Sequence, residues 1–527
     1  MKVETEALRR LPWFAIAIAL YPLLHIAAAN PGQVEARSLL IVVGVAAAAS
    51  IGLLILLRRL YGDWLRAGLG VAWLALLFFS YGPVNAMLAR PDADPDVQTL
   101  TLGWLDSHLH AVQSAIWLLL LALGWMLLRR FKPATGRLAS ALNFASCLLL
   151  ALALVQWLAG RDTDVATVNA VQPGAAATAA APDIYFIVLD GYARADVLAQ
   201  HYGYDNGSFT RGLQRRGFEV AGASESNYNW TFLSLASTLN MDYLPALLGK
   251  GFDEKSSDRE ATYRLLRDNR AAAFLRARGY RYVHLQSTWG GTGSNPFADD
   301  FRRCGGGAFR DDYLLAIADA SWLRAFGSSA SFDLASCHMQ NFSTLGALAR
   351  EPGPKFVLAH FVPPHHPYLF DREGRVLRDA NLSNQFEFQK KLWEDRAAYV
   401  DQLAFVSRSV EGAVDRLIAE GSRPSVILLL SDHGPNLRRG LSTAEQYRVR
   451  LANLVAVRMP GNRARMIPDD VSNVNLLRIV LAHEFGADLP PLPDRHFVSA
   501  FLQPFDFREL NSSGAPVEQA PRSADNM

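Results

Sequence analysis

The chain has 527 residues, of which half are hydrophobic and 19% charged, and a net charge of +2. This length allows two or more domains. Because the net charge is nearly neutral and no basic stripe is interleaved with aromatic residues, we do not expect a nucleic-acid-binding protein. Nearly every long apolar run lies before about residue 160, so we expect a membrane part followed by a water-soluble part.

Five segments of the N-terminal part are long and apolar enough to cross a bilayer, which takes about 20 residues. They cover residues 11–29, 38–57, 67–88, 109–128 and 138–158. Gly82 and Pro83 interrupt the third segment. A cleaved signal peptide accounts for at most the first of the five. We therefore predict a transmembrane anchor of five helices over residues 1–158, integral to the membrane.

Basic residues cluster before the first segment and in every second loop after it. They are Lys2, Arg9, Arg10, Arg58, Arg59, Arg66, Arg129, Arg130, Lys132 and Arg137. The other two loops hold only Arg37 and Arg90. The positive-inside rule then places the N-terminus in the cytoplasm. Five crossings of the plasma (inner) membrane deliver the remainder of the chain to the periplasmic or extracellular side.

After a Pro- and Ala-rich linker at 159–182, strand-like and helix-like segments alternate over residues 183–507. We predict strands at 184–189, 218–222, 281–285, 355–361 and 426–430, an edge strand at 452–459, and helices at 207–216, 385–419 and 474–485. This alternation predicts an α/β domain with a mostly parallel sheet and helices on both faces. The polar stretch 508–527 is predicted to be a disordered tail.

Cys304 and Cys337 are the only cysteines of the outer domain, because Cys147 falls in the fifth apolar segment. An oxidising exterior would let the two pair. Pairing also requires that their backbones lie close together, which the sequence leaves open.

Three predicted strands end in groups that can bind a metal or transfer a proton. Asp190 ends one strand, His360 lies near the end of another, and Asp432 and His433 follow a third. Each alone is explained by a turn or a helix cap. Together they indicate more, because the carboxyl ends of parallel strands share one edge of the sheet. Two carboxylates and an imidazole at that edge suit a divalent cation such as Zn²⁺ or Mn²⁺.

The stretch from Thr231 has helical spacing, with Leu235 and Leu239 four residues apart. Thr231 would stand at the start of this helix, where unpaired backbone N–H groups favour an anion. The alternative is that Thr231 is an ordinary helix cap. A nearby metal would favour ionisation of its hydroxyl and make a covalent intermediate feasible.

Four stretches, DIYFIVLDG, NWTFLSLAS, AHFVPPHHPY and SDHG, occur in an order that resembles the alkaline phosphatase/sulfatase superfamily. The predicted anchor resembles its branch of lipoteichoic-acid synthases and phosphoethanolamine transferases. The resemblance implies that Thr231 is the nucleophile and that Asp190, Asp432 and His433 bind the metal together with it. It also implies that His365 contacts the transferred phosphoryl group, with His366 and His360 as alternatives in that substrate-binding role.

Two departures from the family pattern narrow the chemistry. Sulfatases have Cys or Ser followed by x-Pro-x-Arg, whereas this chain has Thr231-Phe-Leu-Ser-Leu. Formylglycine-dependent sulfate hydrolysis is therefore not expected. Sulfatases also commonly have a second Asp after the first, where this chain has Gly191. The loss of one ligand favours a single metal ion, and a second metal that uses His360 stays an alternative.

The resemblance implies a membrane-anchored, metal-dependent transferase that takes a phospho-headgroup from a phospholipid such as phosphatidylglycerol or phosphatidylethanolamine. An envelope glycan or lipid would be the acceptor. Arg438, after the SDHG stretch, is a candidate ligand of the phosphate. Two alternatives stay open: a phosphatase or phosphodiesterase of the same superfamily, and a non-catalytic module that binds envelope polysaccharide. The presence of all four residues Asp190, Thr231, Asp432 and His433 speaks against the non-catalytic module.

Overall fold

The computed structural model divides the chain into two compact units. The membrane unit comprises Met1–Thr163 together with Asp311–Ala330, and the globular unit comprises Asp164–Arg310 together with Ser331–Met527. The structure describes residues 11–29, 34, 36–88, 103–130, 136–159, 181–249, 252–305, 312–326, 328–377, 393–461, 466–511 and 514–517. The two units are described separately below.

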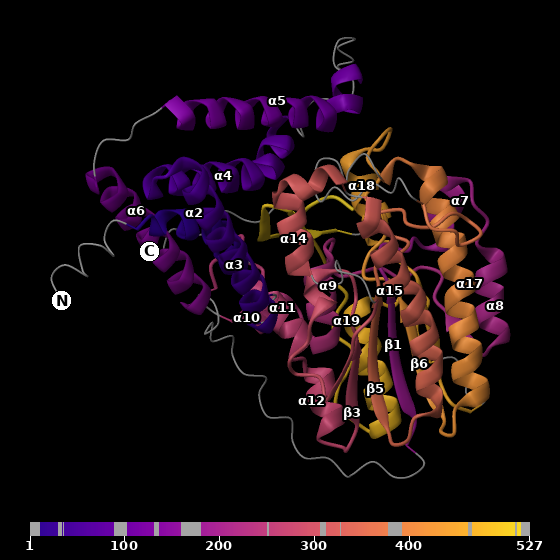
Figure 1. The fold of residues 1–527 in the computed structure, drawn as a ribbon. Helices are drawn as coiled ribbons and strands as arrows, with labels where there is room; N and C mark the ends of the chain where they lie inside the picture. Colours follow the sequence, from indigo (N-terminus) through magenta and orange to yellow (C-terminus); the bar gives the residue numbers. More distant parts are fainter. Residues whose placement is uncertain are drawn as a thin grey trace, which may run out of the picture. The chain divides into compact units, whose positions relative to one another are not determined.

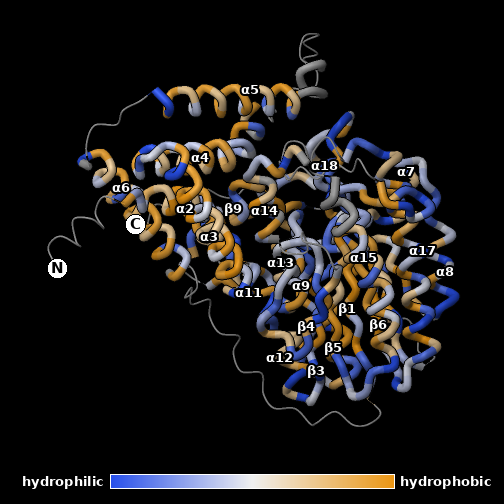
Figure 2. Tube along the Cα trace, viewed as in Figure 1, coloured by the Kyte–Doolittle hydropathy of each residue, from blue (hydrophilic) through white to orange (hydrophobic). Residues whose placement is uncertain are grey.

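Five apolar helices form most of the membrane unit. They are α2 (Trp13–Ala29), α3 (Ala36–Tyr61), α4 (Trp64–Leu88), α5 (Gly103–Arg130) and α6 (Gly136–Ala159). The last four contain stretches long and apolar enough to span a membrane, and α2 is a shorter apolar helix of 17 residues. Figure 2 shows α3 and α5 hydrophobic along most of their length. The predicted sequence of apolar helices followed by an α/β domain is confirmed, and α4 continues through Pro83.

Two further elements of the membrane unit come from much later in the chain. The helix α14 (Asp312–Ala320) and the 3₁₀ helix η1 (Trp322–Phe326) lie within Asp311–Ala330. The sequence pattern assigns this stretch to the outer domain at 183–507, whereas its contacts group it with the membrane helices. No sequence signal distinguishes this stretch, because nine helical residues with a mixed polar and apolar pattern are typical of a soluble domain.

A seven-stranded sheet forms the centre of the globular unit, with strand order β2-β7-β6-β1-β5-β3-β4. The strands are β1 (Asp183–Leu189), β2 (Phe218–Val220), β3 (Arg281–Leu285), β4 (Asp300–Arg302), β5 (Lys355–Phe361), β6 (Ser425–Leu430) and β7 (Val455–Arg458). The pairs formed by β1, β3, β4, β5 and β6 are parallel, and β7 runs antiparallel to β2 and β6. The predicted mostly parallel sheet is confirmed. The prediction that 452–459 lies at the edge is wrong, because β2 pairs on its outer side.

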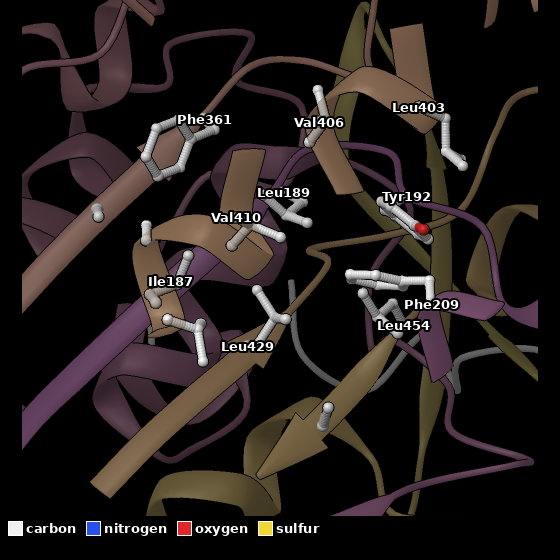
Figure 3. Packing of buried hydrophobic residues seen from close by; sticks show 14 of the residues in the cluster. Ile187, Leu189, Tyr192, Phe209, Phe361, Leu403, Val406, Val410, Leu429 and Leu454 are labelled. Carbon is white, nitrogen blue, oxygen red and sulfur yellow. The ribbon is translucent and has the colours of Figure 1, made fainter. Parts of the chain in front are cut away.

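Helices cover both faces of this sheet (Figure 1). Alternate residues of β1 point to opposite faces, so Ile187 and Leu189 join one core while Phe186 and Val188 join another. The first core includes side chains of α7 (Ala195–Tyr202), α8 (Gly207–Arg215), α15 (Ser328–Ala347) and α17 (Arg396–Glu420). The second includes side chains of α9 (Thr231–Asn240), α11 (Glu260–Arg267), α12 (Arg270–Arg276) and α19 (Asn473–Phe485). Figure 3 shows Val406 and Val410 of α17 near Leu189 and Leu429.

Smaller elements complete the globular unit. They are α10 (Leu244–Leu248), α13 (Gly290–Gly293), η2 (Leu348–Arg350), α18 (Thr443–Leu451) and the hairpin of β8 (His496–Ala500) with β9 (Gln503–Leu510). The strand β9 continues to Leu510, past residue 508, where the sequence predicts that the disordered tail begins, and residues 518–527 lie outside the described part. The predicted helix 385–419 begins at Arg396, and its residues before 393 are also outside the described part. Cys304 and Cys337 form a disulfide.

Candidate active site

The strands β1, β5 and β6 bring their carboxyl ends to one edge of the sheet. Val188 of β1 is the register partner of both His360 and Leu430. Asp190 and Asp432 each follow two residues later along parallel, adjacent strands. The backbone N–H of Asp190 donates to the carbonyl oxygen of Phe361 at 2.9 Å, which extends the ladder to the acid itself. The sheet therefore fixes both carboxylates at the same edge.

Asp190, Asp432 and His433 are buried, and each offers a ligand atom within 4.8 Å of the other two. Nδ1 of His433 lies 3.0 Å from the carbonyl oxygen of Gly434. Since a carbonyl only accepts, Nδ1 carries the proton and Nε2 offers its lone pair. This Nε2 lies 3.0 Å from Oδ2 of Asp432. Such an anchored imidazole is the usual arrangement of a metal-binding histidine.

The two carboxylates lack the partners that burial normally requires. Within the described residues, Oδ1 of Asp190 and Oδ2 of Asp432 are buried without a hydrogen-bond donor. Burial raises the pKa of Asp190, and burial together with the neighbouring Asp190 charge raises the pKa of Asp432 to about 7. Two buried carboxylates at this distance are stabilised as anions by a divalent cation. The residues present therefore fit one divalent metal ion.

Thr231 is the first residue of α9, and its hydroxyl faces the same site. Its Oγ1 lies 3.0 Å from Nε2 of His433. Burial raises the pKa values of Asp190 and Asp432, and a hydrogen bond from the Thr231 hydroxyl, which can reach one carboxylate at a time, opposes part of that rise. The residue that caps α9 is Trp230, which makes no side-chain cap bond. The hydroxyl of Thr231 is therefore turned to the carboxylates and is not used as a helix cap.

His365 and His366 lie in the loop after β5. The backbone N–H of His365 donates to the carbonyl oxygen of Asp190 at 3.1 Å, and its Nδ1–H donates to the carbonyl oxygen of His366 at 2.6 Å. The ring centroids of His365 and His433 lie 6.4 Å apart. Burial lowers the pKa of His365, whereas the charge of Asp190 raises it. His366 is more deeply buried, and burial lowers its pKa well below the ordinary value.

The remaining two sequence candidates lie differently. His360 is buried, with Nε2 3.4 Å from Oδ2 of Asp190 and Nδ1 2.8 Å from Oγ1 of Thr292. His360 thus contacts Oδ2 of Asp190, whereas Oδ1 is the oxygen that has no hydrogen-bond donor among the described residues. Arg438 is exposed, and its backbone N–H donates to Oε1 of Glu394 at 2.9 Å. The structure therefore gathers Asp190, Thr231, Asp432 and His433 closely, and holds Arg438 on the surface.

Arg450 is a site residue that sequence reasoning missed. Its side chain is buried, with Nε donating to the carbonyl oxygen of Asn229 at 2.8 Å and Nη1 to that of Gly434 at 2.9 Å. Its Nη2 donates to Nε2 of His433 at 3.0 Å. Burial lowers the pKa of Arg450 to about 10, so the guanidinium is still charged at neutral pH. The two carbonyls thus hold a desolvated cation beside Thr231.

Two tryptophans enclose this cation. The guanidinium carbon of Arg450 lies 5.3 Å from the ring centroid of Trp230 and 5.8 Å from that of Trp393. Trp393 also packs edge-on against His365, with ring centroids 4.8 Å apart. Trp393 was missed as well, because it falls inside the predicted helix 385–419, where a tryptophan is usually a packing residue, and it in fact precedes α17. The two aromatic rings lower the access of water to the guanidinium, which strengthens its electrostatic interactions.

Gly191 explains why this site lacks the second aspartate of sulfatases. Its φ is +65°, and a Cβ placed there would meet Cη2 of Trp393 at 2.6 Å. Its backbone N–H donates to Oδ1 of Asp432 at 3.1 Å. A side chain at this position would collide with Trp393 and strain the backbone. The glycine therefore permits the close packing of Trp393 against the turn that carries Asp190.

No family model matches the sequence, and no curated protein sequence matches it. Solved structures do match. The C-terminal periplasmic domain of EcEptC from Escherichia coli matches with a TM-score of 0.42 and 10% identity, over 63% of this chain and 94% of that one. The integral membrane protein lipooligosaccharide phosphoethanolamine transferase A from Neisseria meningitidis matches with a TM-score of 0.37 and 12% identity, over 89% and 95%. A phosphonate monoester hydrolase of Agrobacterium radiobacter matches with a TM-score of 0.38 and 14% identity, over 60% and 75%.

Two of these matched proteins carry the name of a phosphoethanolamine transferase or of its periplasmic domain, and the third is a phosphonate monoester hydrolase. Their identities to this chain are low and their TM-scores lie below 0.5. The function of the chain is therefore argued below from its own residues.

Proposed function

We propose that this protein is a membrane-anchored, metal-dependent transferase that moves a phospho-headgroup from a phospholipid donor through Thr231. The observation that carries the proposal is the contact of the Thr231 hydroxyl with His433, inside a buried pair of carboxylates. A threonine hydroxyl is a weak nucleophile unless a neighbouring group promotes loss of its proton. A divalent ion such as Zn²⁺ or Mn²⁺ supplies that activation when it is bound to Asp190, Thr231, Asp432 and His433.

In the first step, Oγ1 of Thr231 attacks the phosphorus of the donor phosphodiester. The new bond joins Oγ1 to phosphorus, and the bond between phosphorus and the diacylglycerol oxygen breaks. The leaving oxygen then takes a proton, for which the protonated form of His365 is the candidate donor. In the second step, the hydroxyl oxygen of an envelope glycan or lipid bonds to the same phosphorus, its proton passes to the now neutral His365, and the bond between phosphorus and Oγ1 of Thr231 breaks.

Arg450 provides the fixed positive charge that this reaction needs. Negative charge accumulates on the equatorial oxygens of the phosphoryl group as it is transferred. The guanidinium is held by two backbone carbonyls and does not have to reorganise when that charge develops. His366 and His360, buried behind His365 and Asp190, are candidates to position those two groups. The exposed Arg438 is a candidate contact for parts of the substrate outside the site.

The membrane unit supports a lipid as the donor. The predicted orientation puts the globular unit on the outer face of the plasma (inner) membrane, where headgroups of that leaflet are the nearest phosphodiesters. A free phosphodiester in water would require no anchor of this kind. Phosphatidylglycerol and phosphatidylethanolamine differ only in the headgroup alcohol, and an experiment distinguishes them.

The test is mass spectrometry of the Thr231 peptide from the full chain in liposomes loaded with either lipid and with Zn²⁺ or Mn²⁺. We expect the added mass of one phospho-headgroup with one of the two lipids. Thr231→Ser keeps a hydroxyl and should retain the adduct, whereas Thr231→Ala should lack it. Released headgroup phosphate without an acceptor would identify the hydrolase alternative. An adduct that survives in Thr231→Ala would remove Thr231 from the mechanism.

A further inference from the structure

The segment 312–326 packs as part of the membrane unit, although the chain reaches it from the globular unit and returns to that unit afterwards. Its helix α14 has nine residues, which is about 14 Å of helix. A hydrocarbon core is about 30 Å thick, so α14 cannot cross it. The segment must therefore approach the membrane helices from one side and leave on the same side.

Tyr313 and Ile317 of α14 are buried in a cluster with ends of several membrane helices. The cluster includes Leu23, Leu24 and Ala27 of α2, Leu39 of α3 and Ala153 of α6. The hydroxyl of Tyr313 donates to the carbonyl oxygen of Leu23 at 3.0 Å. Away from water such a hydroxyl needs a partner within the protein, and this bond supplies it. The contact is thus both apolar and directional.

Trp322 of η1 makes a second attachment, on α4 and α5. Its ring stacks on that of Tyr81, with centroids 6.0 Å apart and planes 14° from parallel. Its Nε1–H donates to Oγ of Ser114 at 3.3 Å, and the hydroxyl groups of Ser114 and Tyr81 lie 3.2 Å apart. Tyr81 is fully buried. The apolar cluster around Leu23 and this polar cluster of Tyr81 and Ser114 together form the site on the membrane helices that binds the segment, called the seat below.

All of these contacts lie at one set of helix ends. Leu23 and Tyr81 stand in the C-terminal halves of α2 and α4, whereas Leu39 and Ser114 stand in the N-terminal halves of α3 and α5. In successive helices that cross a membrane in opposite directions, these ends share one face. The C-terminal end of α6, from which the chain continues to the globular unit, is on that face too. The seat therefore lies on the side of the membrane at which the chain leaves α6.

The disulfide joins the chain shortly before and after this segment. Cys304 and Cys337 have Cα atoms 4.7 Å apart and are separated by 33 positions. The chain therefore leaves the globular unit and returns to it at nearly the same point. Closing the loop restricts how far the segment can move from that point. Leu323 of this segment is 44% exposed, as are many apolar side chains on the surface of the membrane helices.

We propose that residues 312–326 form a second membrane attachment of the globular unit, seated on the outer-leaflet ends of the membrane helices and independent of the linker 159–182. The attachment needs no transfer chemistry. Its test is therefore separate from that of Thr231, and Thr231→Ala should behave as wild type in it.

The experiment places a site-specific protease sequence in the linker of the full chain, reconstituted in liposomes of phosphatidylethanolamine and phosphatidylglycerol. After cleavage, verified on a denaturing gel, the liposomes are washed with high salt and sedimented. We expect the C-terminal fragment to sediment with the liposomes. Release of that fragment from the otherwise unchanged protein would overturn the proposal.

A double variant, Tyr313→Asp with Trp322→Asp, should release the fragment at least tenfold more than wild type, because the carboxylates have no place in the seat. Leu502→Asp is the matched control, since Leu502 is a 75% exposed apolar residue of the globular unit. It should leave the fragment bound. Retention of the double variant, or release by the control, would show that another surface holds the fragment. The melting temperature of each released fragment reports whether it is folded.

Discussion

The hydroxyl oxygen of Thr231 lies 3.0 Å from Nε2 of His433, although 202 positions separate the two residues. The oxygen proposed as the nucleophile and the nitrogen proposed as a metal ligand are therefore in direct contact. Loss of the metal should therefore remove activity without unfolding the sheet, since β1 and β6 are paired along their whole length.

The first prediction concerns metal ligation by Asp432. Asp432→Asn keeps the shape of the side chain but removes a charge, and we expect metal affinity to fall about 10-fold or more. Elemental analysis after dialysis measures this, together with loss of turnover in EDTA and recovery with Zn²⁺ or Mn²⁺. Asp506→Asn is the control, because the Asp506 side chain is 52% exposed. Equal metal content in the two variants would contradict the assignment.

The second prediction concerns Arg450. Arg450→Lys keeps the charge but cannot donate to Asn229, Gly434 and the site at once. We expect turnover to fall about 10²–10³-fold, as for the loss of one preorganised donor. Arg448→Lys on the same helix α18 should change turnover little, because Arg448 is exposed. Thermal melts of both variants show whether the effect is on catalysis or on folding. If Arg450→Lys turns over substrate as fast as wild type, the guanidinium has a structural role and no part in catalysis.

The third prediction separates backbone strain from crowding at two glycines. Gly191 and Gly203 have φ values of +65° and +62°, but only Gly191 lies against a ring, since nothing lies within 4 Å of a Cβ at Gly203. Substitution by Ala should cost each about 1–2 kcal/mol in free energy of unfolding. Gly191→Ala should cost more and should also reduce activity, because Trp393 must move. Denaturant titration and turnover check this, and equal effects in the two variants would show that strain alone matters.

The fourth prediction concerns acid stability. His284 and His338 are fully buried, and burial lowers the pKa of His284 to about 4 and that of His338 to about 3. Unfolded histidine has a pKa of about 6.5. Below about pH 6.5 these two histidines bind protons in the unfolded chain but stay neutral in the folded chain. The free energy of unfolding should therefore fall as the pH drops from about 6.5 towards 4. At pH 5 each histidine should contribute about 1–2 kcal/mol to this loss.

His338→Gln tests the effect, since an amide can still bond to Oγ1 of Thr288, 2.9 Å from Nε2 of His338. Urea midpoints at pH 7.5 and pH 5, in EDTA throughout, should differ less for this variant than for wild type. His483→Gln is the control, because the His483 side chain is 36% exposed. If His338→Gln loses as much stability in acid as wild type does, the buried imidazole is not the cause.

The sequence was informative where one physical signal dominates. Runs such as 356–359 and 426–430 are apolar throughout because both faces of the sheet are covered, and the structure has strands there. The polar residues at their ends stood out against that background, so Asp190, Asp432 and His433 could be named together. The same reasoning misplaced 452–459 at the edge of the sheet, because strand order is decided by contacts between distant residues.

Arg450 and Trp393 carried no comparable signal. Arg450 lies in a polar helix, where an arginine usually faces water, and its burial depends on carbonyls contributed by Asn229 and Gly434. The segment 312–326 was missed for a related reason. Its apolar face is too short to suggest a membrane, and its hydrogen-bond partners on α2 and α5 lie 290 and 208 positions earlier. Pairings of this kind become visible only in three dimensions.

The late position of α14 has a consequence for biogenesis. The five apolar helices are synthesised before residue 160, yet the seat around Tyr81 and Leu23 is filled by Trp322 and Tyr313. Until the ribosome has synthesised much of the globular unit, the polar groups of Tyr81 and Ser114 lack Trp322 as a partner. A ribosome that stalls between residue 160 and the segment 312–326 would leave the five membrane helices with an unfilled seat. A quality-control protease that recognises this seat would then distinguish unfinished chains from complete ones.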